Sequence, residues 1–481
     1  MLFTQLEFLL FFVMVLLFVW SSRTPRIRHS FLLLASYYFY AYWDYRFCGL
    51  IFLSTVIDYT VASRIERAPN HRAKRLLLCL SLFANLGLLG FFKYCNFFID
   101  SATPLLEAMG LGTSSLSIIL PVGISFYTFQ TLSYTIDVYR GVIKPVERWI
   151  DFAMYVSFFP QLVAGPIVRA SEFLPQLQRM PQWSSRRFYG GAQQMLRGAI
   201  KKVILADRLA EMVDVVFAGS DLYSGATLFV AACAYAGQIY YDFSGYSDLA
   251  IGAAKMLGYR FPINFRHPYL STSLSDFWRR WHMTLSRWLR DYLYISLGGS
   301  RGGTLKTSRN LIITMLLGGL WHGAAWTFVL WGLLHGLGLV VERFFRPATK
   351  KIVDTEAVDL TSGVKSLTRL GQHFRIAVNA MFTLSVVLAG WVLFRSESLD
   401  TAVAYLLRML TGADGIDWFP PLAIAAIACL VAEHLLWLTR FRPMMRLPFD
   451  AWYSPILTAI MVWVLLLYAP VGFRPFVYFQ F

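Results

Sequence analysis

The chain alternates long apolar segments with short polar connections over its whole length. Many of the apolar segments approach or exceed about twenty residues, the length that crosses a bilayer as a helix. We expect about ten to twelve transmembrane helices, because the longest segments have room for two helices or a bend. The apolar segments are 6–20, 30–43, 47–62, 76–99, 115–136, 150–168, 225–257, 310–341, 376–394, 419–438 and 453–471.

This pattern predicts an all-α, polytopic membrane helix bundle with additional interfacial or re-entrant helices. We expect a single domain with N-terminal helices over 1–110, a central core over 115–345 and C-terminal helices over 371–481. Prolines within or beside the apolar segments indicate bends, which lipid tolerates only where neighbours or a water-filled cavity satisfy the freed backbone groups. The prolines are Pro121, Pro160, Pro166, Pro262 and Pro268.

Composition supports a membrane protein. The chain is 57% hydrophobic and 15% charged, whereas soluble domains carry about 25% charged residues. The formal net charge is +16, but the basic residues fall in short connections between apolar segments, as the positive-inside rule and anionic lipid require. A nucleic-acid partner is therefore not expected. The five cysteines show no paired spacing, so we expect neither a disulfide framework nor a metal site.

The distribution of basic residues also predicts the orientation. The first and third connections are rich in basic residues, whereas the second holds only Asp44 and Arg46. The first and third connections are therefore expected in the cytoplasm and the N-terminus outside. No basic residue precedes the first apolar segment, so we interpret it as a retained transmembrane helix and not as a signal peptide. The basic residues of the first and third connections are Arg23, Arg26, Arg28, Arg64, Arg67, Arg72, Lys74 and Arg75.

Residues 270–310 are the least lipid-like long segment. Ser273 and Asp276 resemble a capping box, which predicts a helix that opens near Ser275. Steps of 100° per residue from Trp278 place the aromatic and leucine side chains within about 80° of it and the arginines opposite, as in an interfacial helix. His282 falls at about 40°, on the aromatic face; it is either a satisfied core histidine or the lining of a cavity.

A glycine-rich stretch, residues 298–303, follows this predicted helix. Arg301 lies within it, and Lys306 and Arg309 follow. Such a loop can hold phosphate through backbone N–H groups, although it lacks the spacing of a P-loop. A flexible connector is the alternative interpretation.

The next segment, 310–341, contains thirty-two residues without Asp, Glu, Lys or Arg. A straight helix of that length would extend about 48 Å, so we expect a strong tilt or a break at Gly318 and Gly319. His322 lies inside this segment and is a candidate functional residue, because a titratable ring in hydrocarbon needs partners or a cavity; a buried, hydrogen-bonded histidine is the alternative. His335 is rotated by about 220° from it on one helix, which predicts a packing or supporting role.

Residues 240–248 place Asp242 inside an apolar segment. We predict a bent, partly unwound helix there that faces the bundle interior, since lipid excludes an open strand. Asp242 is therefore expected at a cavity. A Ser-His-Asp triad is not favoured, because the nearby serines lie in no nucleophile-elbow pattern.

Six motifs resemble the membrane-bound O-acyltransferase family, and within it the bacterial alginate O-acetyltransferase branch, which includes enzymes of cellulose acetylation. The resemblance covers nearly the whole chain. The motifs are PVGISFYTFQTLSY (121–134), SFFPQLVAGPIVR (157–169), YYDFSGYSDLAIG (240–252), FPINFRHPY (261–269), DFWRRWHMTLSRWLRDYLYISLGGSRGG (276–303) and LLGGLWHGAAWTFVLWGLLHG (316–336).

The resemblance implies a catalytic core with funnels to both membrane faces, in the inner membrane of a bacterium. The outside location that the basic residues predict for the N-terminus would then be the periplasm. It implies that acetyl-CoA is the donor and that no cofactor is bound permanently. The acetyl group would pass through a periplasmic partner of the serine-hydrolase (SGNH) type, within a polysaccharide synthase or secretion complex. Alginate and cellulose are both plausible acceptors, and the wider family also acts on teichoic acids.

The family's paired active-site positions, an Asn or His and a later His, match His282 and His322. We interpret His322 as the general base and His282 as the residue that orients it or binds the acyl carbonyl. Trp278, Trp321 and His335 are expected to support the site together with Asp242. Arg301, Lys306 and Arg309 are expected to meet the phosphates of the donor.

Two other functions remain open from sequence. A proton or acyl-donor transporter would also place His and Asp in the membrane, although the chain shows no internal repeat. A scaffold for a polysaccharide synthase would tolerate replacement of both histidines.

Overall fold

The computed structural model describes residues 1, 3–345, 362–439, 447–469 and 474–477. These residues form helices joined by turns, with no β-strand among them; an isolated parallel bridge joins Tyr223 and Ile416. The predicted all-α membrane helix bundle is therefore confirmed.

Four helical stretches in the described part of the chain are long and apolar enough to cross a membrane: Pro25–Arg67, His71–Ala108, Trp326–Phe345 and Phe374–Arg395. Three shorter apolar helices are Leu6–Ser21, Pro421–Trp437 and Ser454–Tyr468. Many of their large apolar side chains face outward, as a lipid-covered surface requires. The total number of spans and the orientation stay predictions.

The chain divides into two compact units, each assembled from segments distant in sequence. Unit 1 contains Met1–Leu205, Tyr240–Ile263 and Leu447–Phe481, and unit 2 contains Ala206–Ile239 and Asn264–Arg446. Helix α12 (Gly225–Met256) contributes its first half to unit 2 and its second half to unit 1. The division into three consecutive parts stays a prediction.

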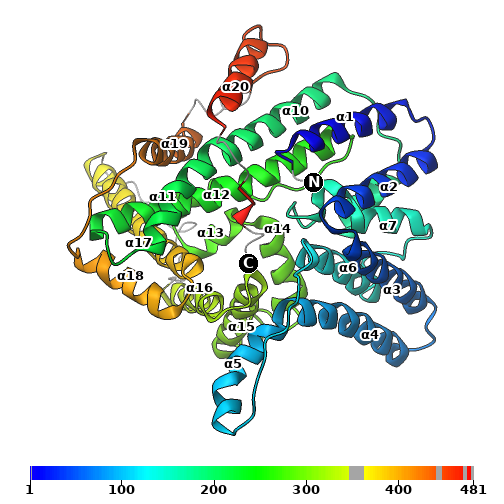
Figure 1. Cartoon of the computed structure of the whole chain (residues 1–481), viewed down its shortest axis with the longest axis horizontal. Coiled ribbons are helices and arrows are strands. Elements are labelled where there is room, and N and C mark those ends of the chain that lie inside the picture. Colours follow the sequence, from blue (N-terminus) through cyan, green and yellow to red (C-terminus); the bar gives the residue numbers. More distant parts are fainter. Residues whose placement is uncertain (2, 346–361, 440–446, 470–473, 478–481) are drawn as a thin grey trace. The chain divides into compact units, whose positions relative to one another are not determined.

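Within unit 1, α3 packs against α4 and α6, and α2 packs against α7 (Figure 1). The 150–168 segment divides at Phe158, before Pro160, into two short helices, so a predicted proline bend is found here. The helices of unit 1 besides α12 are α1 Leu6–Ser21, α2 Pro25–Asp44, η1 Tyr45–Phe47, α3 Cys48–Arg67, α4 His71–Leu89, η2 Gly90–Tyr94, α5 Cys95–Ala108, α6 Ile124–Tyr139, α7 Trp149–Ser157, α8 Phe159–Leu162, α9 Ala170–Leu177, α10 Ser185–Ala199, η3 Ile200–Ala206 and α20 Ser454–Tyr468.

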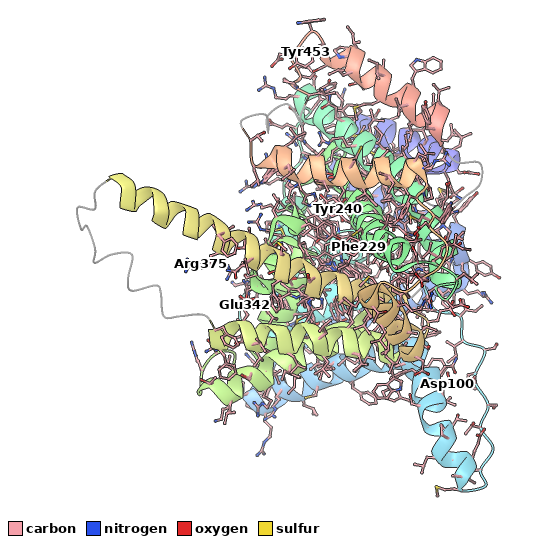
Figure 2. All side chains as sticks on the ribbon, turned by 90° about the vertical axis from the view of Figure 1, so that its left-hand side faces the viewer. Asp100, Phe229, Tyr240, Glu342, Arg375 and Tyr453 are labelled. Carbon is pink, nitrogen blue, oxygen red and sulfur yellow. The ribbon has the colours of Figure 1, made fainter. Side chains whose placement is uncertain are left out.

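Within unit 2, α15 packs against α16, and α16 packs against α17. Glu342, near the end of α16 (Figure 2), accepts a hydrogen bond of 2.9 Å from the backbone N–H of Ser275 and so joins α16 to the start of α13. The helices of unit 2 besides α12 are α11 Asp207–Ala218, η4 Pro268–Leu270, α13 Leu274–Arg280, α14 Met283–Trp288, η5 Leu289–Tyr294, α15 Thr304–His322, α16 Trp326–Phe345, α17 Ser362–Arg395, α18 Leu399–Thr411 and α19 Pro421–Trp437.

Candidate functional site

The long apolar segment that contains His322 forms a helical hairpin. Helix α15 ends at His322 and α16 begins at Trp326, and the two helices run antiparallel. Glycines allow their backbones to touch: a Cβ on Gly319 would lie 2.2 Å from the carbonyl oxygen of Phe328, and one on Gly332 would lie 2.3 Å from that of Met315.

The predicted break in this segment is found, but its predicted place at Gly318 and Gly319 is wrong. Both residues lie inside α15, and Gly319 serves the contact between the helices instead of a kink. The turn comes after His322, which places this ring at the tip of the hairpin and not in the middle of a span.

The predicted amphipathic helix is interrupted at His282. Ser273 caps α13 by accepting a 3.1 Å hydrogen bond from the N–H of Asp276, as expected, and the helix begins at Leu274. However, α13 ends at Arg280 and α14 begins at Met283. The steps of 100° per residue, which placed His282 on the aromatic face of one continuous helix, therefore do not apply to this residue.

Hydrogen bonds to residues 264–266, which precede α13, stabilise this interruption of the helix. The N–H of Arg266 bonds to the carbonyl of Arg280, and the N–H of Met283 bonds to the carbonyl of Asn264, both at 2.9 Å. The amide oxygen of Asn264 also accepts the Thr284 hydroxyl at 2.7 Å. These bonds compete with the helical ones, so the helix cannot continue through residues 281 and 282.

His282 occupies the left-handed backbone region, with φ of 39°. Few residues other than glycine adopt this conformation, but Asn, Asp and His do so more readily than the others. Because the helix breaks there, the His282 ring points into the interior and is fully buried.

The two candidate histidines lie next to each other in unit 2. Their ring centroids are 6.3 Å apart, and the ring of His322 is 4% exposed. At this separation the ring nitrogens approach to about 4 Å at closest, beyond direct hydrogen-bond range. Burial lowers the pKa of His282 to about 3, so its ring is neutral near neutral pH.

Aromatic rings surround the pair. The centroid of Trp321 lies 5.9 Å from that of His282 and 5.0 Å from that of His322. Trp331 and Phe394 approach the His322 ring edge-on, at 5.1 and 5.4 Å. The pair therefore sits in a largely apolar surrounding, where electrostatic interactions are stronger than in water.

His335 lies one ring further away. The rotation of 220° does not apply, because His322 ends α15 whereas His335 lies in α16. The Trp331 ring contacts both, with its centroid 5.1 Å from that of His322 and 4.9 Å from that of His335. Trp278 contacts His335 at 5.2 Å. The buried indole N–H groups of Trp278 and Trp331 have no hydrogen-bond partner among the described residues.

Asp242 belongs to unit 1 and forms a buried ion pair with Lys202, with 2.7 Å between Oδ1 and Nζ. Its Oδ2 also accepts the backbone N–H of Val477 at 2.9 Å. The predicted unwinding around Asp242 is wrong, because α12 is helical throughout and the carboxylate is satisfied by Lys202 and the C-terminal segment. The prediction that this helix faces the interior is confirmed by the burial of Asp242. Its role at a cavity stays a prediction.

The three predicted donor-binding cations, Arg301, Lys306 and Arg309, are exposed at the start of α15 and in the loop before it. The loop is an ordered turn: its four glycines have positive φ, and the amide nitrogen of Asn310 donates to the carbonyl of Gly299 at 3.0 Å. In the part of the chain that the structure describes, no group of three His, Cys, Asp or Glu side chains could hold a metal ion.

Sequence reasoning missed Trp331 and Asn264. Trp331 precedes His335 by one helical turn, so their shared face could have been found from spacing. Asn264 acts on His282 across an interruption of the helix, which no local pattern marks.

Comparison with known proteins adds a separate finding. Residues 148–385 match the membrane-bound O-acyltransferase family. A probable alginate O-acetylase of Azotobacter vinelandii is 42% identical over 416 residues, which cover 86% of this chain and 79% of the relative. A peptidoglycan O-acetyltransferase of Helicobacter pylori is 37% identical over 424 residues (82% and 76%). A teichoic acid D-alanyltransferase of Streptococcus thermophilus is 29% identical over 297 residues (59% and 69%).

Proposed function

Because the chain belongs to the membrane-bound O-acyltransferase family and is an O-acyltransferase, we propose that it moves an acetyl group from cytoplasmic acetyl-CoA across the membrane for O-acetylation of an exopolysaccharide. The names of the relatives support O-acetylation as the reaction and favour alginate over cellulose as the acceptor. A periplasmic serine-hydrolase-like subunit receives the acetyl group within a polysaccharide synthase or secretion complex.

The observation that carries the proposal is the buried pair of imidazoles 6.3 Å apart. A reacting oxygen beside the gap between the rings lies within hydrogen-bond reach of both. His322 at the hairpin tip removes the proton from the acceptor hydroxyl, which then attacks the carbonyl carbon of the thioester. The thiolate of coenzyme A leaves when the tetrahedral intermediate collapses, and the proton on His322 passes to it.

His282 acts in its neutral form in this scheme. A neutral imidazole carries one N–H group. This group donates a hydrogen bond either to a reacting group that also contacts His322 or to the oxyanion that develops on the acyl carbonyl. Burial among aromatic rings makes such a donor effective because water does not compete with it.

The exposed cations at the start of α15 and in the loop before it bind the donor from the cytoplasmic side. Arg301, Lys306 and Arg309 present their charges to solvent, where the phosphates of acetyl-CoA meet them. The acetyl end then extends toward the histidine pair.

Polysaccharide acetylation in cells tests the proposal. In a strain that lacks the native gene, His322→Ala is expected to abolish acetylation although the protein reaches the membrane at normal level. His71→Ala changes an exposed histidine at the start of α4 and serves as the matched control, with acetylation unchanged. Normal acetylation by His322→Ala would favour a transporter or scaffold role over catalysis by this residue.

A further inference from the structure

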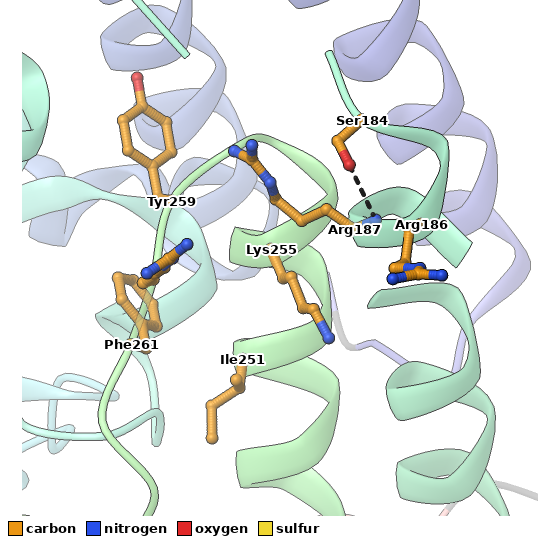
Figure 3. A pocket seen from close by; sticks show the side chains of 8 residues that line it. Ser184, Arg186, Arg187, Ile251, Lys255, Tyr259 and Phe261 are labelled. Atoms are coloured by element: carbon orange, nitrogen blue, oxygen red, sulfur yellow. Dashed lines mark hydrogen bonds between the residues drawn. The ribbon is translucent and has the colours of Figure 1, made fainter. Parts of the chain in front are cut away.

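Unit 1 contains a pocket of about 540 Å³ at the start of α10 and the end of α12 (Figure 3). Four cationic side chains line it, from both helices and from the segment that follows α12, and two aromatic rings complete it. These residues are Arg186, Arg187, Lys255, Arg260, Tyr259 and Phe261.

The charged side chains that line the pocket are all positive. Among the residues that the structure describes, no carboxylate lines the pocket. Arg186 pairs with Asp450 at 2.7 Å, but both side chains are highly exposed, so solvent screens that pair. Four cations around one hollow repel one another, and an anion inside the pocket relieves this repulsion. Arginine adds a planar set of N–H donors that matches the oxygens of a phosphate.

The pocket is also held in shape by its surroundings. Arg187 Nη1 donates to the carbonyl of Gly258 at 3.4 Å. Gly190 in α10 leaves room for Lys255, since a Cβ there would lie 2.8 Å from its Nζ. Tyr259 is buried against Phe158, with their ring centroids 5.4 Å apart. These contacts give a preformed site, which lowers the entropic cost of binding.

The same end of α12 lies next to the first connection of the chain. Trp20 Nε1 donates to the carbonyl of Met256 at 3.1 Å, and Arg28 Nη2 donates to that of Leu257 at 2.5 Å. The positive-inside pattern predicts that this connection is cytoplasmic. The pocket then opens on the cytoplasmic side.

From these observations we propose that the pocket binds a phosphate group of a phosphorylated ligand that reaches the protein from the cytoplasmic side. The volume lies within the usual range of ligand pockets and exceeds that of phosphate alone, so part of the remaining molecule enters too. Two sources supply this chemistry: the nucleotide portion of a soluble thioester donor and the headgroup of an anionic phospholipid. The first source rests on the proposed function, because it is the proposed acetyl donor, and the pocket would then hold a phosphate of the donor in addition to those that meet Arg301, Lys306 and Arg309. The second source does not rest on it, and binding of either ligand is measured without turnover.

The test compares two doubly substituted proteins with equal loss of charge. Lys255→Gln with Arg260→Gln removes two cations from the pocket. Arg26→Gln with Arg179→Gln removes two exposed arginines that do not line it and is the control. Lys255→Arg with Arg260→Lys keeps the charge and is expected to keep binding, which separates loss of charge from misfolding.

Coenzyme A without an acetyl group is titrated into each protein in zwitterionic nanodiscs. In parallel, phosphatidylglycerol retained through purification from mixed-lipid membranes is quantified. Binding of coenzyme A that is at least about tenfold weaker in the pocket variant alone supports a nucleotide ligand. Unchanged coenzyme A binding, with phosphatidylglycerol lost in the pocket variant alone, supports a lipid ligand. If neither ligand distinguishes the pocket variant from the control, the inference is overturned.

Discussion

The imidazole rings of His282 and His322 lie 6.3 Å apart, although forty residues separate them in the chain. An interrupted helix brings one ring to this place, and the tip of a helical hairpin brings the other. Each ring thus depends on a local departure from regular helix, and each departure can be tested by substitution.

The left-handed backbone at His282 predicts a difference between two substitutions. His282→Asn retains a residue that accepts this conformation, so the protein is expected to keep its thermal stability and part of its acetyltransferase activity. His282→Val places a β-branched residue at φ of 39° and is expected to cost about 1–3 kcal/mol of stability and all activity. Thermal unfolding in detergent and acetyl transfer are measured together. Equal stability of the two variants would contradict the assigned backbone strain.

The buried, neutral state of His282 predicts acid-sensitive stability. Its pKa falls from 6.5 in the unfolded chain to about 3 in the folded protein, so between these values the unfolded chain binds more protons. The contribution of the neutral His282 ring to the free energy of unfolding is complete above pH 6.5. It is lost as the pH falls toward 3. At about pH 5 the loss amounts to about 2 kcal/mol. Comparison of thermal unfolding at about pH 7 and pH 5 should show a smaller acid effect in His282→Asn than in the unchanged protein; an equal effect would refute the assignment.

The close contact of α15 and α16 predicts that Gly319→Ala destabilises the hairpin. The new Cβ would lie 2.2 Å from a backbone carbonyl, so the helices must separate and displace His322. A cost of about 1–3 kcal/mol and a marked loss of activity are expected. Gly87→Ala in α4 is the control, because nothing lies within 4 Å of its Cβ. Similar unfolding temperatures for the two variants would argue against the tight crossing.

The Lys202–Asp242 pair predicts strong coupling between its partners. Lys202→Met leaves a carboxylate that is 1% exposed without its counter-charge and is expected to cost about 3–5 kcal/mol. Addition of Asp242→Leu should recover most of that loss. Lys201→Met provides the comparison, since the Lys201–Asp248 pair is 20% exposed on both sides and its loss costs less. A double variant no more stable than Lys202→Met would exclude this coupling.

Periodicity and capping are local signals, and they predicted the helical class and the start of α13. Isolated polar residues also drew attention to the two histidines, whose catalytic role stays a prediction. The sequence did not predict the geometry that joins the histidines. The interruption at His282 depends on Asn264 from another segment, and the hairpin turn depends on glycine contacts between two helices. In the same way, Asp242 suggested an unwound helix only because its partner Lys202 could not be identified from sequence. These features arise from tertiary contacts, which periodicity does not record.

Acetyl transfer by purified protein in proteoliposomes tests the role of His322 most directly. Acetyl-CoA labelled in the acetyl group is supplied on one side of the vesicle membrane and the periplasmic partner or an acceptor oligosaccharide on the other, and loss of thioester is followed. His322→Ala is expected to lower the rate by about 10²–10⁴-fold while coenzyme A binding and thermal stability stay unchanged. A folded His322→Ala protein that consumes the thioester at the unchanged rate would contradict the assignment of His322 as the general base.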